Sequence, residues 1–258
     1  MIRVYLTQLP HTSSCELDKQ GVRRAASLAA YSLLDFAYRD TLGEPLPPIL
    51  RTENGKPYQE KNSHGVHFNL SHTDFYAAVL LSDEGECGID IEGECGSQMS
   101  ERIEKRFLSG ITLEPGKIDG EPLFFLCDSE YKTKRELVPS TKSLEPSEKT
   151  NNGPIHTPEK KLPTVNNTLA YPDCRCDVRP TEQPTHADRS AVARLTEQPI
   201  DADRPAIARW TMLEAALKAD GRGFGGYKEA GKIIPSVGIR HYEFYNGELI
   251  YISLAIKK

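Results

Sequence analysis

The distribution of proline is the feature that most constrains how this chain can fold. Twelve of the 18 prolines lie within residues 110–209, and the same stretch holds only four of the 20 aromatic residues. Its part from Val138 to Asn167 is rich in Pro, Ser, Thr, Lys, Glu and Asn, a composition that buries too little apolar area to offset chain entropy. We therefore expect a low-complexity, disordered insertion over 110–207, between an N-terminal half over 1–109 and a C-terminal half over 208–258.

A tandem repeat lies near the end of the expected insertion. Residues 181–195 (TEQPTHADRSAVARL) and 196–210 (TEQPIDADRPAIARW) repeat with a period of 15. Two copies are too few, and 15 residues too short, for a solenoid. The repeat is interpreted as one duplicated linker that leads into a helix.

Charge, hydropathy and cysteine content exclude several classes of protein. The net charge of -5 disfavours nucleic-acid partners, because binding to phosphates needs a basic surface. No run of 18 apolar residues occurs and the first residues lack a secretory pattern, so we expect a cytoplasmic chain without membrane contact. Six cysteines are too few for a disulfide scaffold. The close pair Cys174 and Cys176 lacks further ligands for zinc, so free thiols are expected.

Outside the insertion, the periodicity predicts a small set of elements. Apolar residues at helical spacing predict an amphipathic helix from Gly21 to Tyr38. Alternating or continuous apolar runs predict strands over 66–72, 75–81 and 87–92, interpreted as a three-strand meander. Near the end of the chain, Asn246-Gly247 separates two apolar runs and predicts a hairpin with a type I′ turn.

Two carboxylates on the third predicted strand could bind a cation. In the segment 88–92 (GIDIE), side chains alternate, so Asp90 and Glu92 share one face, about 6 to 7 Å apart by the rise of a strand. Paired carboxylates suit magnesium, a hard cation that prefers oxygen ligands. The alternative is an ordinary solvated strand face.

A predicted helix after the insertion carries a second candidate pair. Strong helix formers run from Trp210 to Lys218 and stop at Asp220-Gly221, with Trp210, Leu213 and Leu217 expected on the buried side. Glu214 and Lys218, four residues apart, lie together on a neighbouring face, where one could bind a metal and the other neutralise a phosphate. The alternative is a surface ion pair of small energetic value.

Two further segments could contact phosphates. Ser71 and His72 end the first predicted strand, and their side chains could donate hydrogen bonds to a phosphate. The alternative is that His72 is a partly buried histidine without a role in binding, as a single histidine usually is. Arg51, Lys56 and Pro57 belong to a segment with a tight turn and two cations, which is equally common on protein surfaces.

In chain order, the motifs NGKPY (54–58), FNLSH (68–72), GIDIE (88–92) and WTMLEAALKADGRG (210–223) resemble the 4′-phosphopantetheinyl transferase superfamily of the surfactin-synthetase-activating type. The resemblance covers about 20–109 and 208–258. It implies an α+β fold of two similar halves related by a pseudo-twofold axis, with coenzyme A and magnesium in the cleft between them. Because one chain supplies both walls, a monomer is expected.

The resemblance implies a function and a role for each candidate residue. Such enzymes move 4′-phosphopantetheine from coenzyme A to a serine of an acyl or peptidyl carrier protein and release adenosine 3′,5′-bisphosphate. The resemblance implies that Glu214 is the base and that Lys218 is catalytic and neutralises a pyrophosphate oxygen. It implies that the magnesium ligands are Asp90, Glu92 and Glu214. It further implies that coenzyme A phosphates contact Ser71 and His72, and that the nucleotide lies by Arg51, Lys56 and Pro57.

Two departures from the family pattern leave alternatives open. Leu213 stands where family members usually carry Lys, and 118 positions separate Glu92 from Trp210, far more than is usual in the family. One alternative is a catalytically silent relative that binds coenzyme A or a carrier protein without transfer. Another, a magnesium-dependent phosphotransferase for a different nucleotide, is less favoured because no Walker or kinase signature is present.

Overall fold

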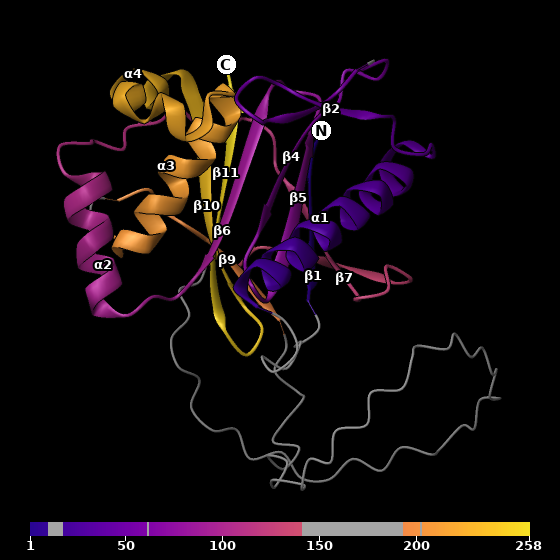
Figure 1. Ribbon diagram of the computed structural model, residues 1–258, viewed down its shortest axis with the longest axis horizontal. Helices are drawn as coiled ribbons and strands as arrows, with labels where there is room; N and C mark the ends of the chain where they lie inside the picture. The colour runs from indigo at the N-terminus through magenta and orange to yellow at the C-terminus, as the bar shows by residue number, and fades with distance from the viewer. Residues whose placement is uncertain (10–17, 61, 141–192, 202) are drawn as a thin grey trace, which may run out of the picture. The chain divides into compact units, whose positions relative to one another are not determined.

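The structure is a computed structural model that describes residues 1–9, 18–60, 62–140, 193–201 and 203–258. These residues combine helices with sheets of five, four and two strands, which confirms a mixed α+β class (Figure 1). Most of the first repeat copy, together with Cys15, Cys174 and Cys176, lies outside the described residues. The pseudo-twofold relation between two halves stays a prediction.

The five-stranded sheet carries most of the N-terminal part of the fold. Its strand order is β4 (His67–His72), β5 (Tyr76–Ser82), β1 (Ile2–Gln8), β7 (Leu123–Cys127) and β8 (Lys134–Leu137). Neighbouring strands are antiparallel, except that β1 and β7 are parallel. The helix α1 (Lys19–Leu42) lies across β4 and β5 (Figure 1). This helix confirms the one predicted over 21–38.

The ends of α1 follow from local sequence. The Asp18 side chain accepts a hydrogen bond from the N–H of Gly21 at 2.7 Å, which caps the first turn. Gly43 ends the helix at φ 74°, a left-handed conformation that favours glycine.

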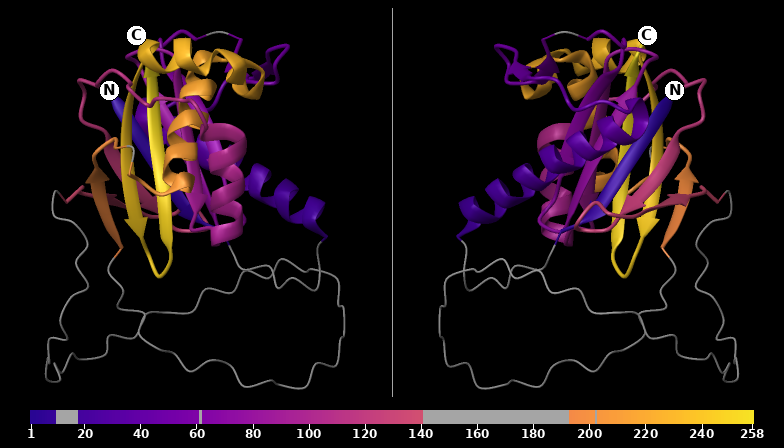
Figure 2. Two further views of the ribbon diagram at one scale, coloured as in Figure 1. Left: turned by 90° about the vertical axis from the view of Figure 1, so that its left-hand side faces the viewer. Right: turned by 90° about the vertical axis from the view of Figure 1, so that its right-hand side faces the viewer.

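The four-stranded sheet has the order β6 (Cys87–Gly93), β11 (Leu249–Lys257), β10 (Val237–Tyr245) and β9 (Arg194–Gln198), and all its pairs are antiparallel. The long β10–β11 hairpin is drawn in yellow in Figure 2. The helix α3 (Ala206–Asp220) covers one face of this sheet. At Gly88 it comes so close that an added Cβ would lie 2.1 Å from the carbonyl oxygen of Ala215. Only glycine allows this contact between α3 and β6.

The two large sheets pack face to face around one apolar core, which includes Val4, Leu80, Phe124, Ile89 and Ile252. A second core joins α3 to the outer face of the four-stranded sheet, and a third joins α1 to the outer face of the five-stranded sheet. The order of layers is therefore helix, sheet, sheet, helix. This order places Ile89 and Ile91 of β6 in the central core and turns Asp90 toward α3.

Smaller elements complete the described part of the chain. They are the two-stranded sheet of β2 (Ile49–Arg51) and β3 (Pro57–Gln59), the helix α2 (Ser97–Ile103) with the π-helical turn η1 (Glu104–Leu108), the 3₁₀ segments η2 (Gly223–Glu229) and η3 (Ile234–Ser236), and the short helix α4 (Ala230–Ile233). No helix among the described residues is both long and apolar enough to cross a membrane.

Two sequence predictions about strands were wrong. The strands over 66–72, 75–81 and 87–92 exist, but they do not form a meander, because β6 pairs with β11 in the other sheet. The terminal hairpin exists, but its turn is not type I′. Gly247 has φ 86°, whereas Asn246 does not share the positive φ that a type I′ turn requires, and the loop has three residues between the paired Tyr245 and Leu249.

Part of the range that the sequence assigned to an insertion contributes to the sheets. β7, β8 and β9 all lie within 110–207, as does the start of α3. Phe124 lies in the central core and Phe125 in the core under α1, so two adjacent aromatic residues serve opposite faces of one sheet. The low average aromatic content of the whole range conceals these short apolar strands. The boundaries 1–109, 110–207 and 208–258 themselves remain a prediction.

Candidate functional site

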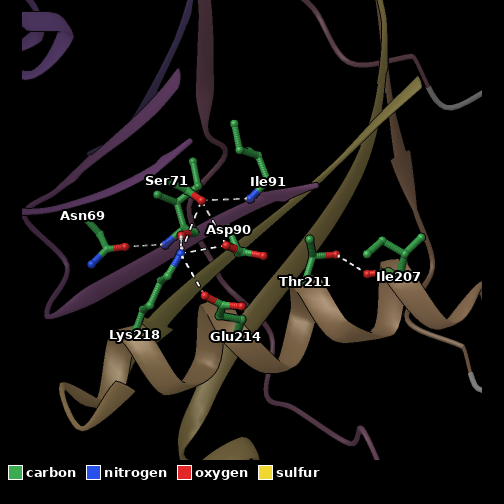
Figure 3. A network of polar contacts seen from close by, with 9 residues as sticks. Asn69, Ser71, Asp90, Ile91, Ile207, Thr211, Glu214 and Lys218 are labelled. Carbon is green, nitrogen blue, oxygen red and sulfur yellow. Dashed lines mark hydrogen bonds and ion pairs between the residues drawn. The ribbon is translucent and has the colours of Figure 1, made fainter. Parts of the chain in front are cut away.

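Asp90 is the buried centre of the polar cluster in Figure 3. Its side chain is on β6, and only 3% of the residue is exposed. Its Oδ1 accepts a hydrogen bond from Ser71 Oγ at 3.0 Å and one from Lys218 Nζ at 2.7 Å, while its buried Oδ2 has no partner among the residues that the structure describes. Burial raises the pKa of Asp90, since the pull of Lys218 in the opposite direction is smaller and the charge of Glu214 adds to the increase.

Lys218 reaches from α3 to both neighbouring strands. Besides Asp90, its ammonium contacts Ser71 Oγ at 3.3 Å, the carbonyl oxygen of Ile89 at 3.2 Å and Glu214 Oε1 at 3.5 Å (Figure 3). Burial disfavours its charge, yet the nearby carboxylates outweigh burial and raise the pKa of Lys218. One ammonium therefore balances two carboxylates from different elements.

Glu92 adds a third carboxylate on the same face of β6 as Asp90. Burial raises its pKa to about 7, and repulsion from Asp90 and Glu214 contributes to the increase. The positive charge of Lys218 acts in the opposite direction and lowers the pKa of Glu92, but it is outweighed by burial and by the two carboxylates.

The donor set fits a hard divalent cation. Asp90, Glu92 and Glu214 supply carboxylate oxygens, which magnesium prefers, and the unpartnered Oδ2 of Asp90 is a buried acceptor that a cation would satisfy. Within the described residues, no three His, Cys, Asp or Glu side chains are arranged as a ready metal cage. Lys218, in contact with both Asp90 and Glu214, is the cation that the cluster contains.

Ser71 and His72 end β4 at the edge of this cluster. Ser71 is buried and contacts Asp90 directly, whereas His72 is exposed. The pKa of His72 is lowered by partial burial of its ring and by the positive charges of Lys218 and Arg23. Arg23 lies in the first turns of α1 and is a neighbour that the sequence analysis did not assign to the site. The adjacent Arg23-Arg24 pair was the available signal, but nothing local showed where α1 would dock.

Arg51, Lys56 and Pro57 line a separate cavity of about 700 Å³, together with Phe68, Gly221 and Arg222. Arg51 donates to the carbonyl oxygen of Gly55 at 2.9 Å and to the Tyr31 hydroxyl at 2.8 Å. Lys56 Nζ contacts Glu86 Oε2 at 3.2 Å and the carbonyl oxygen of Ala219 at 3.4 Å. The lining of the cavity therefore combines basic side chains with acidic ones, among them Glu86 and Asp220, and with the apolar Pro57 and Phe68.

The helix α3 connects the cavity to the polar cluster. Lys218 belongs to the cluster, and Asp220 and Gly221 at the end of the same helix line the cavity. The residues predicted from the sequence thus form two groups, the Asp90 cluster and the cavity lining, and both groups lie near the C-terminal end of α3. The functional role of every residue in both groups stays a prediction.

Leu213 stands where the resemblance described above leads to the expectation of a lysine. It is fully buried in the core between α3 and the four-stranded sheet, next to Leu217 on the side opposite to solvent. Trp210, predicted on the same buried side, is only partly buried and packs against Phe107. A charge at position 213 would point into apolar surroundings, so this chain has no phosphate-facing cation there.

Part of the chain is similar to curated 4′-phosphopantetheinyl transferases. It is 48% identical over 73 residues to 4′-phosphopantetheinyl transferase AcpT of Salmonella typhi, and the alignment covers 28% of this chain and 35% of that protein. The same values hold for AcpT of Salmonella typhimurium. AcpT of Escherichia coli K12 is 45% identical over 73 residues, which cover 28% of this chain and 34% of the relative.

The chain spans about a third of the length of the curated relatives it matches. No protein-family model matches it. The surfactin-synthetase-activating subtype that the motifs suggest stays a prediction. What the matches establish is partial homology between this chain and 4′-phosphopantetheinyl transferases.

Proposed function

We propose that this chain transfers 4′-phosphopantetheine from coenzyme A to a serine hydroxyl of an acyl or peptidyl carrier protein, with magnesium, and releases adenosine 3′,5′-bisphosphate. The partial homology supports the reaction type. The observation that carries the proposal is the meeting of Ser71, Asp90, Glu214 and Lys218, which come from three elements and three separate motifs. An incidental surface ion pair would not bury Asp90 or join β4, β6 and α3.

Glu214 is the proposed base. Its side chain is 28% exposed, so an incoming hydroxyl can reach it, whereas Asp90 is enclosed. The serine oxygen forms a bond to the phosphorus that carries pantetheine, the bond from that phosphorus to the leaving adenosine bisphosphate breaks, and the serine proton passes to Glu214. Lys218 stabilises the negative charge that moves onto the leaving phosphate.

Asp90, Glu92 and Glu214 would hold the magnesium ion. When bound, the ion neutralises pyrophosphate charge and aligns the reacting oxygens. Asp90 is anchored for this task by its bond from Ser71, and none of the described residues forms a hydrogen bond to its Oδ2.

The cavity with Arg51, Lys56 and Pro57 is proposed to take the nucleotide of coenzyme A. Its volume of about 700 Å³ suits a small-molecule ligand. Ser71 and His72, at the other end of β4, would contact coenzyme A phosphates, where hydroxyl and imidazole N–H groups donate hydrogen bonds.

Intact-mass measurement of an apo acyl carrier protein tests the proposal. The carrier is incubated with this chain, coenzyme A and magnesium, in parallel with Glu214→Ala and with Glu248→Ala, a matched control at an exposed glutamate of the β10–β11 turn. We expect one phosphopantetheine to be added by the unsubstituted chain and by Glu248→Ala, and none by Glu214→Ala. The same assay is repeated with an apo peptidyl carrier.

The second candidate function is binding without transfer. It is favoured by Leu213, a buried apolar residue at the position where 4′-phosphopantetheinyl transferases usually carry a lysine. Binding of coenzyme A in titration calorimetry, together with no mass gain on either carrier, would establish this alternative and refute the transferase.

A further inference from the structure

In the described part of the chain, one edge of strand β6 is not paired with a strand by backbone hydrogen bonds. Its other edge pairs with β11, whereas β4 lies beside it but belongs to the five-stranded sheet. On the β4 side, the N–H of Ile89 donates to Asn69 Oδ1 at 3.1 Å and the N–H of Ile91 donates to Ser71 Oγ at 3.3 Å (Figure 3). Two side chains of β4 thus replace a backbone ladder, which satisfies donors that would otherwise be buried without partners.

These two side chains have different neighbours. Asn69 and Ser71 are two residues apart on β4 and share a face. Ser71 contacts Asp90 and Lys218 directly. Asn69, only 4% exposed, contacts instead the backbone of Ile89, the residue before Asp90.

Ile89 is held at both of its polar backbone groups. Its N–H is bonded by Asn69, and its carbonyl oxygen accepts from Lys218 Nζ at 3.2 Å. The backbone that carries the Asp90 side chain is therefore fixed from β4 and from α3. If Asn69 lost its acceptor, the buried N–H of Ile89 would lack a partner unless β6 moved, and any such movement displaces the Asp90 carboxylate.

We propose that Asn69 is a positioning residue, which fixes β6 through Ile89 so that the Asp90 carboxylate is held in the orientation that binds a divalent cation. The inference rests on the proposed function in taking Asp90 as a cation ligand. None of the hydrogen bonds described joins Asn69 to a carboxylate of the cluster or to Lys218. Asn69 therefore acts on Asp90 only through the backbone of Ile89. Groups that orient a metal ligand typically change metal affinity by 10- to 100-fold when they are removed.

The test measures cation binding and backbone exchange in the full chain, without coenzyme A. Asn69→Leu keeps the approximate volume and removes the acceptor, and Asn69→Asp keeps an oxygen in its place. Ser82→Ala is the matched control, because Ser82 Oγ accepts from the N–H of Glu84 at 3.1 Å, a bond of the same kind away from the cluster. Titration with Mn²⁺ alone gives the affinity, and hydrogen exchange resolved by NMR gives protection of the Ile89 amide.

We expect Asn69→Leu to bind Mn²⁺ about tenfold or more weakly, with faster exchange at Ile89. Asn69→Asp should restore protection at Ile89 and bind Mn²⁺ at least as well as the unsubstituted chain. Ser82→Ala should lose stability comparably to Asn69→Leu but keep its Mn²⁺ affinity. A purely structural role predicts that both variants lose stability and neither loses cation affinity.

Unchanged Mn²⁺ affinity in Asn69→Leu would overturn the inference. If that chain does not fold, Asn69→Ser, whose side chain is too short to reach Ile89, takes its place with the same expected result. Absence of Mn²⁺ binding to the unsubstituted chain would instead refute the cation site and the proposed function. The inference about Asp90 then falls with the cation site. Failure of the inference alone is recognised when the unsubstituted chain binds Mn²⁺ and Asn69→Leu shows the same affinity or the same protection of the Ile89 amide.

Discussion

Replacing Glu92 with Gln should stabilise the metal-free chain at neutral and alkaline pH. Burial raises the pKa of Glu92 from 4.5 to about 7, and Asp90 and Glu214 contribute. Because the folded chain then holds this proton more tightly than the unfolded chain, ionisation of Glu92 opposes folding. The penalty is absent well below pH 4.5, where both states are protonated, grows as the pH rises through 4.5, and is complete above about pH 7.

The magnitude follows from the displacement of the pKa. One pKa unit corresponds to about 1.4 kcal/mol of free energy. The displacement from 4.5 to about 7 therefore sets an upper limit of about 3 kcal/mol for the penalty at pH 8. Because Glu92 keeps part of its contact with solvent, the measured gain in Glu92→Gln should lie between about 1 and 3 kcal/mol.

Urea unfolding in metal-free buffer, repeated at several pH values, measures this gain. Glu94→Gln is the matched control, because Glu94 is exposed two residues further along the chain. The difference in free energy of unfolding between Glu92→Gln and the unsubstituted chain should be near zero at about pH 4.5 and widen up to pH 8, and Glu94→Gln should show no such trend. Magnesium should narrow the difference, because it stabilises the folded chain that still has all three carboxylates. A difference that is independent of pH, or a less stable Glu92→Gln at pH 8, would refute the reasoning.

Three further predictions concern the packing around the site and the range outside the described residues. Gly88→Ala should destabilise the chain by about 2 kcal/mol or more, because the new Cβ would lie 2.1 Å from a carbonyl oxygen of α3. A melting temperature equal to that of the unsubstituted chain would contradict this close contact. Leu213→Lys introduces the residue expected from the motif resemblance, and it should lower the free energy of unfolding by several kcal/mol, since it places a charge in the apolar core. Increased stability or increased coenzyme A affinity would show that position 213 can face the ligand. Deletion of 141–192 with a short glycine linker should leave the melting temperature nearly unchanged, because the N–H of Ser140 already donates to the carbonyl oxygen of Leu195 at 2.8 Å; a large decrease would mean that the deleted segment supports the fold.

Local patterns predicted most of the elements that carry the candidate site. Alternation in 88–92 was enough to place Asp90 and Glu92 on one face of a strand, since strand geometry is local. Helical spacing likewise predicted that the side chains of Glu214 and Lys218 would meet, and in the structure Lys218 Nζ lies 3.5 Å from Glu214 Oε1. The glycine stop at Gly221 was also predicted correctly, and it has φ 89°.

Features that depend on packing between distant segments were not predictable in the same way. The apolar alternation of β6 suits either sheet, so the pattern alone could not show that β6 pairs with β11. The influence of Arg23 on His72 depends on how α1 docks across β4, which no local motif encodes. The separation of Arg51 and Lys56 from the Asp90 cluster likewise depends on where the β2–β3 hairpin packs.

The position of β6, which pairs with β11 of one sheet and lies beside β4 of the other, explains why the candidate site lies where the two sheets meet. A strand that only pairs with β11 leaves the backbone groups of its other edge without partners, and in the interior such groups must be satisfied. Here the partners are polar side chains of β4 and the ammonium of Lys218, and these same groups surround Asp90. Substitutions that disable the site should therefore also change how the two sheets are joined. For this reason, loss of activity in any variant of the cluster can be attributed to chemistry only when its stability and its cation affinity are measured separately.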